Sequence, residues 1–176
     1  MTYAVELYLD KESEKQVAIL ADALPKENRV TGSSSGKRIP HMTLGVFNDV
    51  DETKAEEKLK RLVRQMRRGE AHFVTAGFNA EGGIFLAPVI NDFLYGIHVE
   101  LHETFRFSMV GFEHYSFGKW VPHLTLARYS RDEETIMTAL REVFRNFAPI
   151  KGSFDRVVLS QLGTKPREVC CFKLRD

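Results

Sequence analysis

The sequence repeats one short motif, Pro-His-x-Thr-Leu, in which x is an apolar residue. Its histidines are His41 and His123, which stand 82 residues apart in a chain of 176 residues. In a β-strand, side chains two positions apart point to the same face, so each histidine should share a face with its threonine, Thr43 or Thr125. Two such strands side by side would place two imidazoles and two hydroxyls around one small space. The repeat therefore favours folds that bring the two halves of the chain together.

The same offset relates longer segments of the two halves. Strand-like and amphipathic segments recur in the order strand, helix, motif strand, helix, strand, which gives repeat units of roughly 1–80 and 83–162 and a final strand over 169–174. The strands expected to open and close the units cover residues 3–8, 85–90, 72–78 and 154–161. This alternation predicts an α/β or α+β sandwich, with helices on one side of each sheet and a cleft between the opposite faces. No linker composition interrupts residues 1–176, so we expect one domain.

The composition says more about where the protein is located than about the reaction that it catalyses. The net charge is +1, which argues neither for nor against nucleic acid as a partner. The two cysteines, Cys170 and Cys171, are adjacent, and neighbours on a strand face opposite ways, so we expect no disulfide between them. The N-terminal residues have no basic segment followed by a long apolar run. These features predict a cytoplasmic protein without membrane contact, and none of them calls for an obligate protein partner.

Two imidazoles facing one substrate suit acid–base chemistry at phosphorus. One imidazole can take a proton from a nucleophile while the other gives a proton to the leaving oxygen, which is what cleavage of a phosphodiester requires. The hydroxyls of Thr43 and Thr125 can hold the non-bridging phosphate oxygens. This scheme requires no metal or cofactor, and too few other candidate ligands accompany the motifs to predict a metal site.

Simpler interpretations remain open for these patterns. A duplication could preserve the motif for packing alone, because strands rich in proline and leucine are good core strands. Histidine and threonine are poor choices for a purely structural face, however, so we favour catalysis. His98 and His102 are four residues apart on a helix expected over 92–106, a spacing that can bind metal. We favour a position at the surface or boundary of that helix instead.

The motif regions resemble a known superfamily. The string Val121-Pro-His-Leu-Thr-Leu-Ala-Arg128 closely resembles the second motif of the 2H phosphoesterases in their bacterial 2′-5′ RNA ligase/cyclic phosphodiesterase branch. The endings Val157-Val-Leu-Ser-Gln-Leu-Gly163 and Cys171-Phe-Lys-Leu174 are similar to its closing pair of strands. The resemblance implies a duplicated, bilobal α+β fold, in which two antiparallel-rich sheets line a central cleft with helices outside.

The resemblance also implies a reaction. It makes His41 and His123 the acid/base pair, and Thr43 and Thr125 the phosphate-binding hydroxyls, of a metal-independent phosphodiesterase. We expect its substrate to be a nucleotide or RNA phosphodiester, with the 2′,3′-cyclic phosphate at an RNA end as the leading candidate. Two alternatives stay open. One is a hydrolase of cyclic or 2′-5′-linked oligonucleotide signals, and the other is a module that binds RNA ends or nucleotides with negligible turnover.

Further residues are candidates for binding the substrate. Phe47 and Tyr129 lie six positions after the two histidines and would share their face if the strands contain no bulge, so either ring could stack on a nucleobase. The loops before the two motifs supply other candidates, which are Lys37 and Arg38 for phosphate and Tyr115, Phe117 and Trp120 for stacking. The competing interpretation is that Phe47 and Tyr129 pack where the strands end and that Trp120 anchors its loop.

Overall fold

The computed structural model describes residues 1–30, 39–106, 113–130, 132–164 and 166–176. Lys37 and Arg38 lie outside this range. The first half contains β1 (Thr2–Leu9), α1 (Lys11–Asp22), β2 (His41–Asn48), α2 (Glu52–Arg64) and β3 (Gly69–Phe78). The second half contains β4 (Gly83–Pro88), α3 (Asp92–Phe105), the 3₁₀ turn η1 (Glu113–Tyr115), β5 (Leu124–Arg128), α4 (Glu133–Asn146), β6 (Ile150–Gln161) and β7 (Arg167–Lys173). None of the helices in the described ranges is long and apolar enough to cross a membrane.

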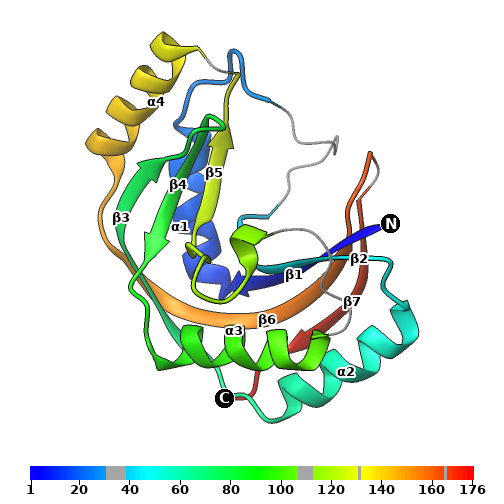
Figure 1. Cartoon of the computed structure of the whole chain (residues 1–176). Coiled ribbons are helices and arrows are strands. Elements are labelled where there is room, and N and C mark those ends of the chain that lie inside the picture. The colour runs from blue at the N-terminus through cyan, green and yellow to red at the C-terminus, as the bar shows by residue number, and fades with distance from the viewer. Residues whose placement is uncertain (31–38, 107–112, 131, 165) are drawn as a thin grey trace.

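The strands form one sheet in the order β1-β2-β5-β4-β3-β6-β7, with a further pairing between β1 and β6. All of these strand pairs are antiparallel, which confirms the predicted α+β class. The two expected sheets are continuous because β6 is twelve residues long and joins them. Its first residues, Ile150–Phe154, pair with β3, and the rest pairs with β1 and β7 (Figure 1).

The two halves of the chain exchange strands. β1 pairs with β2 and β6, and β4 pairs with β5 and β3. The opening strand of each half is therefore flanked by its own motif strand and by the closing strand of the other half. An isolated half would leave an edge of its opening strand unpaired, which is unfavourable for a strand of the central sheet.

The register of the opening strands differs from the expected one. Leu7 stands opposite Met42, and Leu86 stands opposite Leu124, so β1 and β4 correspond with an offset of 79 residues. The 82-residue offset of the motifs had aligned residues 3–8 with 85–90, and β4 instead ends at Pro88. The connection between opening strand and motif strand is thus three residues longer in the second half.

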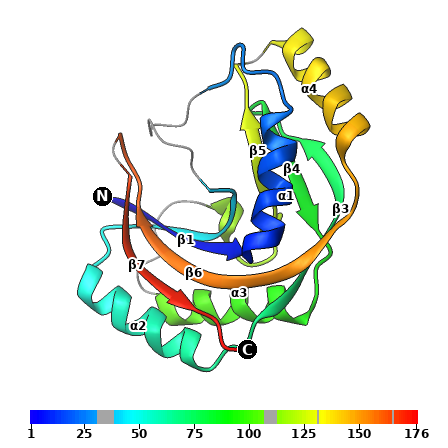
Figure 2. The same cartoon turned by 180° about the vertical axis from the view of Figure 1, so that it is seen from behind.

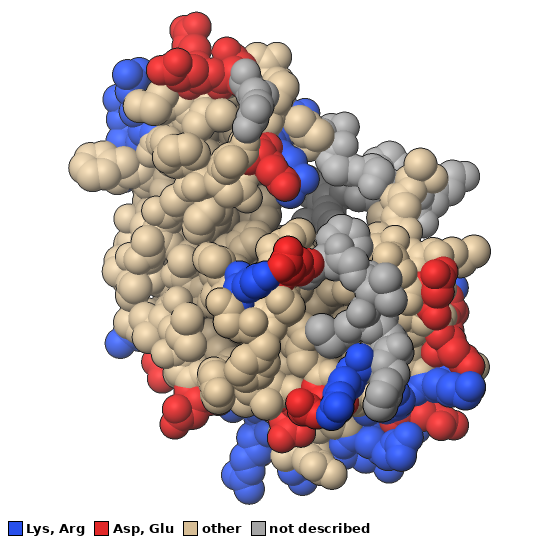
Figure 3. Space-filling view, viewed as in Figure 1, with Lys and Arg blue, Asp and Glu red and all other residues tan. Residues whose placement is uncertain are grey.

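The helices cover the sheet from outside. α2 and α3 pack together, and they contact β7 and β2 respectively, whereas α1 contacts β5 and β6 and α4 contacts β4. Figure 2 shows α1 lying across β4 and β5 on the side away from the viewer of Figure 1. In Figure 3, charged side chains gather near α4 and around α2, and most of the face between them is uncharged.

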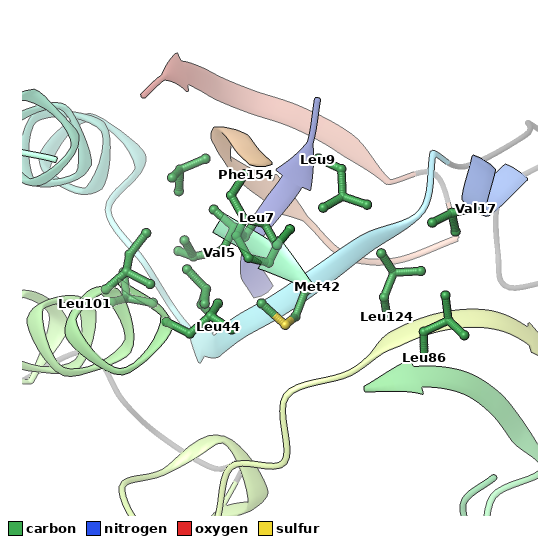
Figure 4. Close-up of a cluster of buried hydrophobic side chains, with 14 of the residues drawn as sticks. Val5, Leu7, Leu9, Val17, Met42, Leu44, Leu86, Leu101, Leu124 and Phe154 are labelled. Atoms are coloured by element: carbon green, nitrogen blue, oxygen red, sulfur yellow. The ribbon is translucent and has the colours of Figure 1, made fainter. Parts of the chain in front are cut away.

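One hydrophobic core joins the two halves. It includes Leu7 of β1, Met42 of β2, Leu86 of β4 and Leu124 of β5, all completely buried. Figure 4 shows these side chains in one cluster with residues from α1, α3 and β6. Because Met42 and Leu124 point into this cluster, the side chains next to them in the motifs must point to the opposite face.

Candidate active site

The two motif strands are neighbours in the sheet. β2 and β5 pair through Met42 and Leu124, which are the residues that follow the two histidines. The two strands are antiparallel. His41 on β2 therefore stands across from Thr125 on β5, and Thr43 stands across from His123. Of the four motif side chains, His41, Thr43 and His123 are partly exposed and Thr125 is exposed. The structure therefore gathers all four on the face opposite the core.

Both imidazoles are held by the same backbone contact. Nδ1 of His41 lies 2.9 Å from the carbonyl oxygen of Ile39, and Nδ1 of His123 lies 2.7 Å from that of Val121. A carbonyl oxygen can only accept, so each Nδ1 must carry the proton and donate it. A proline, Pro40 or Pro122, stands between each carbonyl residue and its histidine. Because a residue before proline prefers an extended backbone, the carbonyl groups of Ile39 and Val121 are directed toward the imidazole rings. Nε2 is then the nitrogen through which each histidine can accept or give a proton.

An aromatic ring stands beside each histidine, although the two rings hold different positions in the opening strands: Tyr8 stands opposite His41, whereas Phe85 stands opposite Thr125. The rings of Tyr8 and His41 are 5.3 Å apart, as are those of Phe85 and His123. Tyr8 belongs to β1 and Phe85 to β4, the two opening strands. These rings restrict the rotation of the imidazoles and form apolar walls beside them.

The opening strands also bring one carboxylate to the site. Glu6 stands opposite Thr43, whereas Phe85 stands opposite Thr125. The Glu6 side chain is buried, accepts hydrogen bonds from the hydroxyls of Tyr8 and Ser160, and places Oε1 3.4 Å from Nε2 of His41. The two halves of the site are therefore alike in backbone and unlike in charge.

Tyr115 is the predicted aromatic residue that reaches the motif side chains. Burial raises the pKa of its phenol, and a hydrogen bond with the Thr43 side chain opposes that shift. Arg128 is close enough to act on the same phenol, and it extends from β5 with Nη2 3.4 Å from Oε2 of Glu81. A phenol and a guanidinium thus accompany the imidazoles and hydroxyls, a set that can bind an anion such as a phosphodiester.

The expectation that Phe47 and Tyr129 share the histidine face is wrong. Both rings are buried, with exposed fractions of 0% and 1%, and Phe47 packs on Phe105 of α3. Each motif strand contains a β-bulge directly after its threonine: Leu44 has no partner between the pairs of Thr43 and Gly45, and Leu126 has none between those of Thr125 and Ala127. The extra residue shifts the alternation by one position and turns the later aromatic rings into the core.

Trp120 and Phe117 turn toward α3. The Trp120 indole donates its Nε1 hydrogen to the carbonyl oxygen of Thr43 and stacks on His98 at 4.1 Å between ring centroids. Phe117 is exposed and contacts Tyr95 and His98. The indole thus anchors its loop to β2 and α3, as the competing interpretation expected, and neither ring has a contact with a motif side chain among the contacts of the described residues.

His98 and His102 are buried rather than exposed on their helix, with exposed fractions of 5% and 7%, so the surface interpretation is wrong. The ring centroids lie 4.2 Å apart. Burial, and then the neighbouring His102, lower the pKa of His98 to about 4. The side chains in the described ranges contain no group of three or more His, Cys, Asp or Glu residues able to hold a metal ion.

Sequence reasoning missed Glu6, Tyr8, Phe85 and Arg128. Glu6 carried a usable signal, because it is a charged residue inside an otherwise apolar strand, Tyr3-Ala-Val-Glu-Leu-Tyr8. Arg128 stands two residues after the second motif. Its exposure depends on the bulge at Leu126, which period-two alternation cannot reveal.

Comparison with known proteins identifies relatives of this arrangement. The family model of the 2′-5′ RNA ligase superfamily matches residues 33–165. No curated protein matches the sequence. A crystal structure of a phosphoesterase aligns with a TM-score of 0.67 and 14% identity over 99% of both chains. LigT of E. coli, in complex with 3′-AMP, aligns with a TM-score of 0.66 and 16% identity over 99% of this chain and 98% of LigT.

A eukaryotic structure shares the same architecture at a lower level of similarity. Usb1 of Kluyveromyces marxianus aligns with a TM-score of 0.50 and 13% identity over 96% of this chain and 97% of Usb1. These likenesses confirm the 2H phosphoesterase fold that the motif resemblance implied. At such identities they concern the fold, and the chemistry rests on the side chains described above.

Proposed function

Because the chain belongs to the 2′-5′ RNA ligase superfamily, whose members act on RNA and nucleotide phosphodiesters, we propose that it is a phosphodiesterase of 2′,3′-cyclic phosphate ends. The substrate would be a nucleoside 2′,3′-cyclic phosphate or an RNA that ends in one. The five-membered cyclic phosphate is strained and small, so two proton transfers and a place for the phosphate suffice to open it.

The matched setting of the two histidines carries this proposal. Both rings donate Nδ1–H to the carbonyl two residues before them, and both motif strands present their histidine on the same face. Each Nε2 can therefore serve in proton transfer without moving the ring. One Nε2 takes a proton from water, which attacks phosphorus. The other Nε2 gives a proton to the ribose oxygen as its bond to phosphorus breaks.

The neighbouring groups fit the binding of an anion. The hydroxyls of Thr43 and Thr125 donate to the two non-bridging oxygens, and Arg128 and Tyr115 lie close enough to add a charge-assisted and a neutral hydrogen bond. The reaction in this scheme passes through protein side chains and water. Support for a nucleotide also comes from LigT, whose crystal structures hold 3′-AMP, NADP⁺ and ATP.

A cytoplasmic location is part of this proposal. Cys170 and Cys171 are free thiols, and β7 turns Cys170 into the core and Cys171 outward. Adjacent free thiols persist most easily in a reducing compartment such as the cytoplasm.

The test is turnover of a substrate panel in the presence of a chelator. The panel contains 2′,3′-cyclic nucleotides, an RNA with a 2′,3′-cyclic phosphate end, 2′-5′-linked oligonucleotides and cyclic dinucleotides. We expect the first two to be opened to monophosphates, and His41→Ala or His123→Ala to lower kcat by about 10²–10⁴-fold. His72→Ala, on β3 away from the motifs, is the matched control and should keep its activity.

Three results would contradict the proposal. Faster turnover of the 2′-5′-linked or cyclic oligonucleotides would assign a signalling substrate instead. Binding of nucleotides without turnover of any substrate would indicate a binding module. Loss of activity in chelator would contradict a reaction that depends on side chains alone.

A further inference from the structure

The buried His98 of α3 takes no part in the proposed proton transfers, yet its side chain is polar. Its exposed fraction is 5%, and a polar ring at such a place costs free energy unless its N–H has a hydrogen-bond partner. Nε2 of His98 lies 3.0 Å from the carbonyl oxygen of Tyr115 in η1. A carbonyl oxygen can only accept, so Nε2 carries a hydrogen and donates it. The imidazole thus links α3 to the segment that leads into the second motif.

The same imidazole supports Trp120, at the end of that segment. The two ring centroids lie 4.1 Å apart and the ring planes differ by 2°, so the rings are stacked. The indole Nε1 donates its hydrogen to the carbonyl oxygen of Thr43 at 3.1 Å. His98 therefore contacts the segment at two places, and the second contact continues to the backbone of a motif residue.

The segment itself, residues 113–120, contains little regular structure. We call it the Tyr115 segment. η1 is three residues long, and the backbone hydrogen bonds that follow it join residues of the segment to one another. Such bonds shape the segment but do not fix its place against the sheet. That place depends on contacts such as those of His98 and Trp120.

The Tyr115 segment carries a group that belongs to the site. The Tyr115 phenol forms a hydrogen bond with the Thr43 side chain, and burial raises the pKa of this phenol. The phenol therefore keeps its hydrogen at neutral pH and can donate it to a phosphate oxygen beside Thr43. Because His98 holds the backbone carbonyl of the same tyrosine, a shift of that backbone would also move the phenol.

We infer that His98 is a positioning residue for phosphate binding, which holds the Tyr115 segment so that the Tyr115 phenol lies beside Thr43. The inference rests on the proposed function, in which these two side chains bind the phosphate. His98 acts through Tyr115 and Trp120 and not on the substrate itself. An apolar residue could fill the same volume, but it would leave the Tyr115 carbonyl without this donor.

The effect of His98 is one of position and not of charge. Burial, and then the neighbouring His102, lower the pKa of His98 to about 4. At neutral pH the ring is neutral, so it adds no positive charge that could attract a phosphate. A change at His98 should therefore act on substrate binding by displacing the Tyr115 phenol.

The experiment is a double-variant cycle on a 2′,3′-cyclic nucleotide. Tyr115→Phe removes the hydroxyl alone, and a hydrogen bond to a charged group contributes about tenfold or more to binding, so KM should rise by about that factor with a smaller change in kcat. His98→Leu removes the donor and the stacked ring, and should raise KM toward the same value. The double variant should be no worse than Tyr115→Phe, because both changes remove one contact. His98→Gln keeps an N–H donor and should raise KM less than His98→Leu.

The matched control is Leu94→Ala. Leu94 is completely buried and lies four residues before His98 on α3, so its loss should lower the stability of the helix packing. We expect its KM to match that of the wild type. This control separates a general loss of stability from displacement of the Tyr115 segment.

Trp120 provides a readout that needs no turnover, because it is the single tryptophan of the chain. Its emission should move to longer wavelength in His98→Leu, since the indole loses a stacking partner and becomes more exposed to water. Titration with inorganic phosphate, followed by the same emission, gives a dissociation constant. We expect His98→Leu to bind phosphate about tenfold more weakly than the wild type and Leu94→Ala to bind it equally well.

Each outcome decides the inference. Multiplicative losses of His98→Leu and Tyr115→Phe, equal KM values in His98→Leu and His98→Gln, or an equal KM rise in Leu94→Ala would overturn it. An unchanged Trp120 emission in His98→Leu would do the same. If the wild-type protein binds phosphate but opens no cyclic phosphate, the proposed function fails, whereas the effect of His98 on phosphate binding still tests the positioning role.

Discussion

Mild acid should destabilise this fold through His98. The imidazole is 5% exposed, stacks on Trp120 at 4.1 Å, and donates Nε2–H to the carbonyl oxygen of Tyr115 at 3.0 Å. Burial, and then the neighbouring His102, lower its pKa to about 4, and the hydrogen bond with Tyr115 opposes part of the shift. Protonation would place a charge between α3 and the segment that carries Tyr115.

The sign and size follow from proton linkage. The histidine titrates near pH 6.5 in the unfolded chain and near 4 in the folded one. Between these values the unfolded chain binds a proton that the folded chain does not, so the stabilisation is complete above pH 6.5 and is lost as the pH falls toward 4. Between pH 7.5 and pH 5.0, His98 alone should reduce the free energy of unfolding by about 2 kcal/mol.

Urea denaturation at the two pH values measures this effect. His98→Gln keeps an N–H donor for the Tyr115 carbonyl but does not titrate, so its free energy of unfolding should fall by about 2 kcal/mol less than that of the wild type. His72→Gln, on β3, provides the control for removing a histidine and should follow the wild type. An equal loss of stability in the wild type and His98→Gln would refute the reasoning.

Three further outcomes are expected. Because both histidines act in one turnover, the double variant His41→Ala/His123→Ala should lose far less activity than the product of the two single losses, as steady-state kinetics would show; multiplicative losses would indicate independent roles. Met42→Ala, a completely buried position at the β2–β5 pairing, should cost about 2–5 kcal/mol in urea denaturation, whereas Met137→Ala, 45% exposed on α4, should cost much less; similar costs would place Met42 outside the core. Tyr115→Ala should raise KM for a cyclic nucleotide more than for a base-free phosphodiester if its ring stacks on the base in addition to the phenol's hydrogen bond to the phosphate beside Thr43; an equal rise on both would leave Tyr115 a phosphate contact alone.

The sequence of the motif was enough to predict that each histidine shares a strand face with its threonine. Period-two alternation within Pro-His-x-Thr-Leu places the histidine and threonine on one face and the apolar residues on the other. The structure agrees, since Met42 and Leu124 are completely buried and the four polar side chains face away from them. This part was predictable because it depends on the geometry of one extended strand over three residues.

The same alternation failed a few residues later. Phe47 and Tyr129 turn into the core because each motif strand bulges after its threonine. A bulge depends on which residues of the neighbouring strand pair with it, and nothing within the bulged strand announces its position. The closing strands show the same dependence: Gly69–Phe73 and Ile150–Phe154 are strands because they pair with each other across the two halves of the chain.

Charge and orientation at the site are also products of long-range pairing. Glu6 reaches His41 only because β1 pairs with β2, and its burial depends on Ser160, far along the chain on β6. Trp120 turns to α3 because a buried histidine there offers a stacking partner. The alternation of apolar and polar residues describes one segment of the chain at a time. It was therefore enough to identify the two histidines of the acid–base pair, because each lies within a single motif. The carboxylate and the aromatic rings beside them come from other strands, which only folding brings next to the motifs.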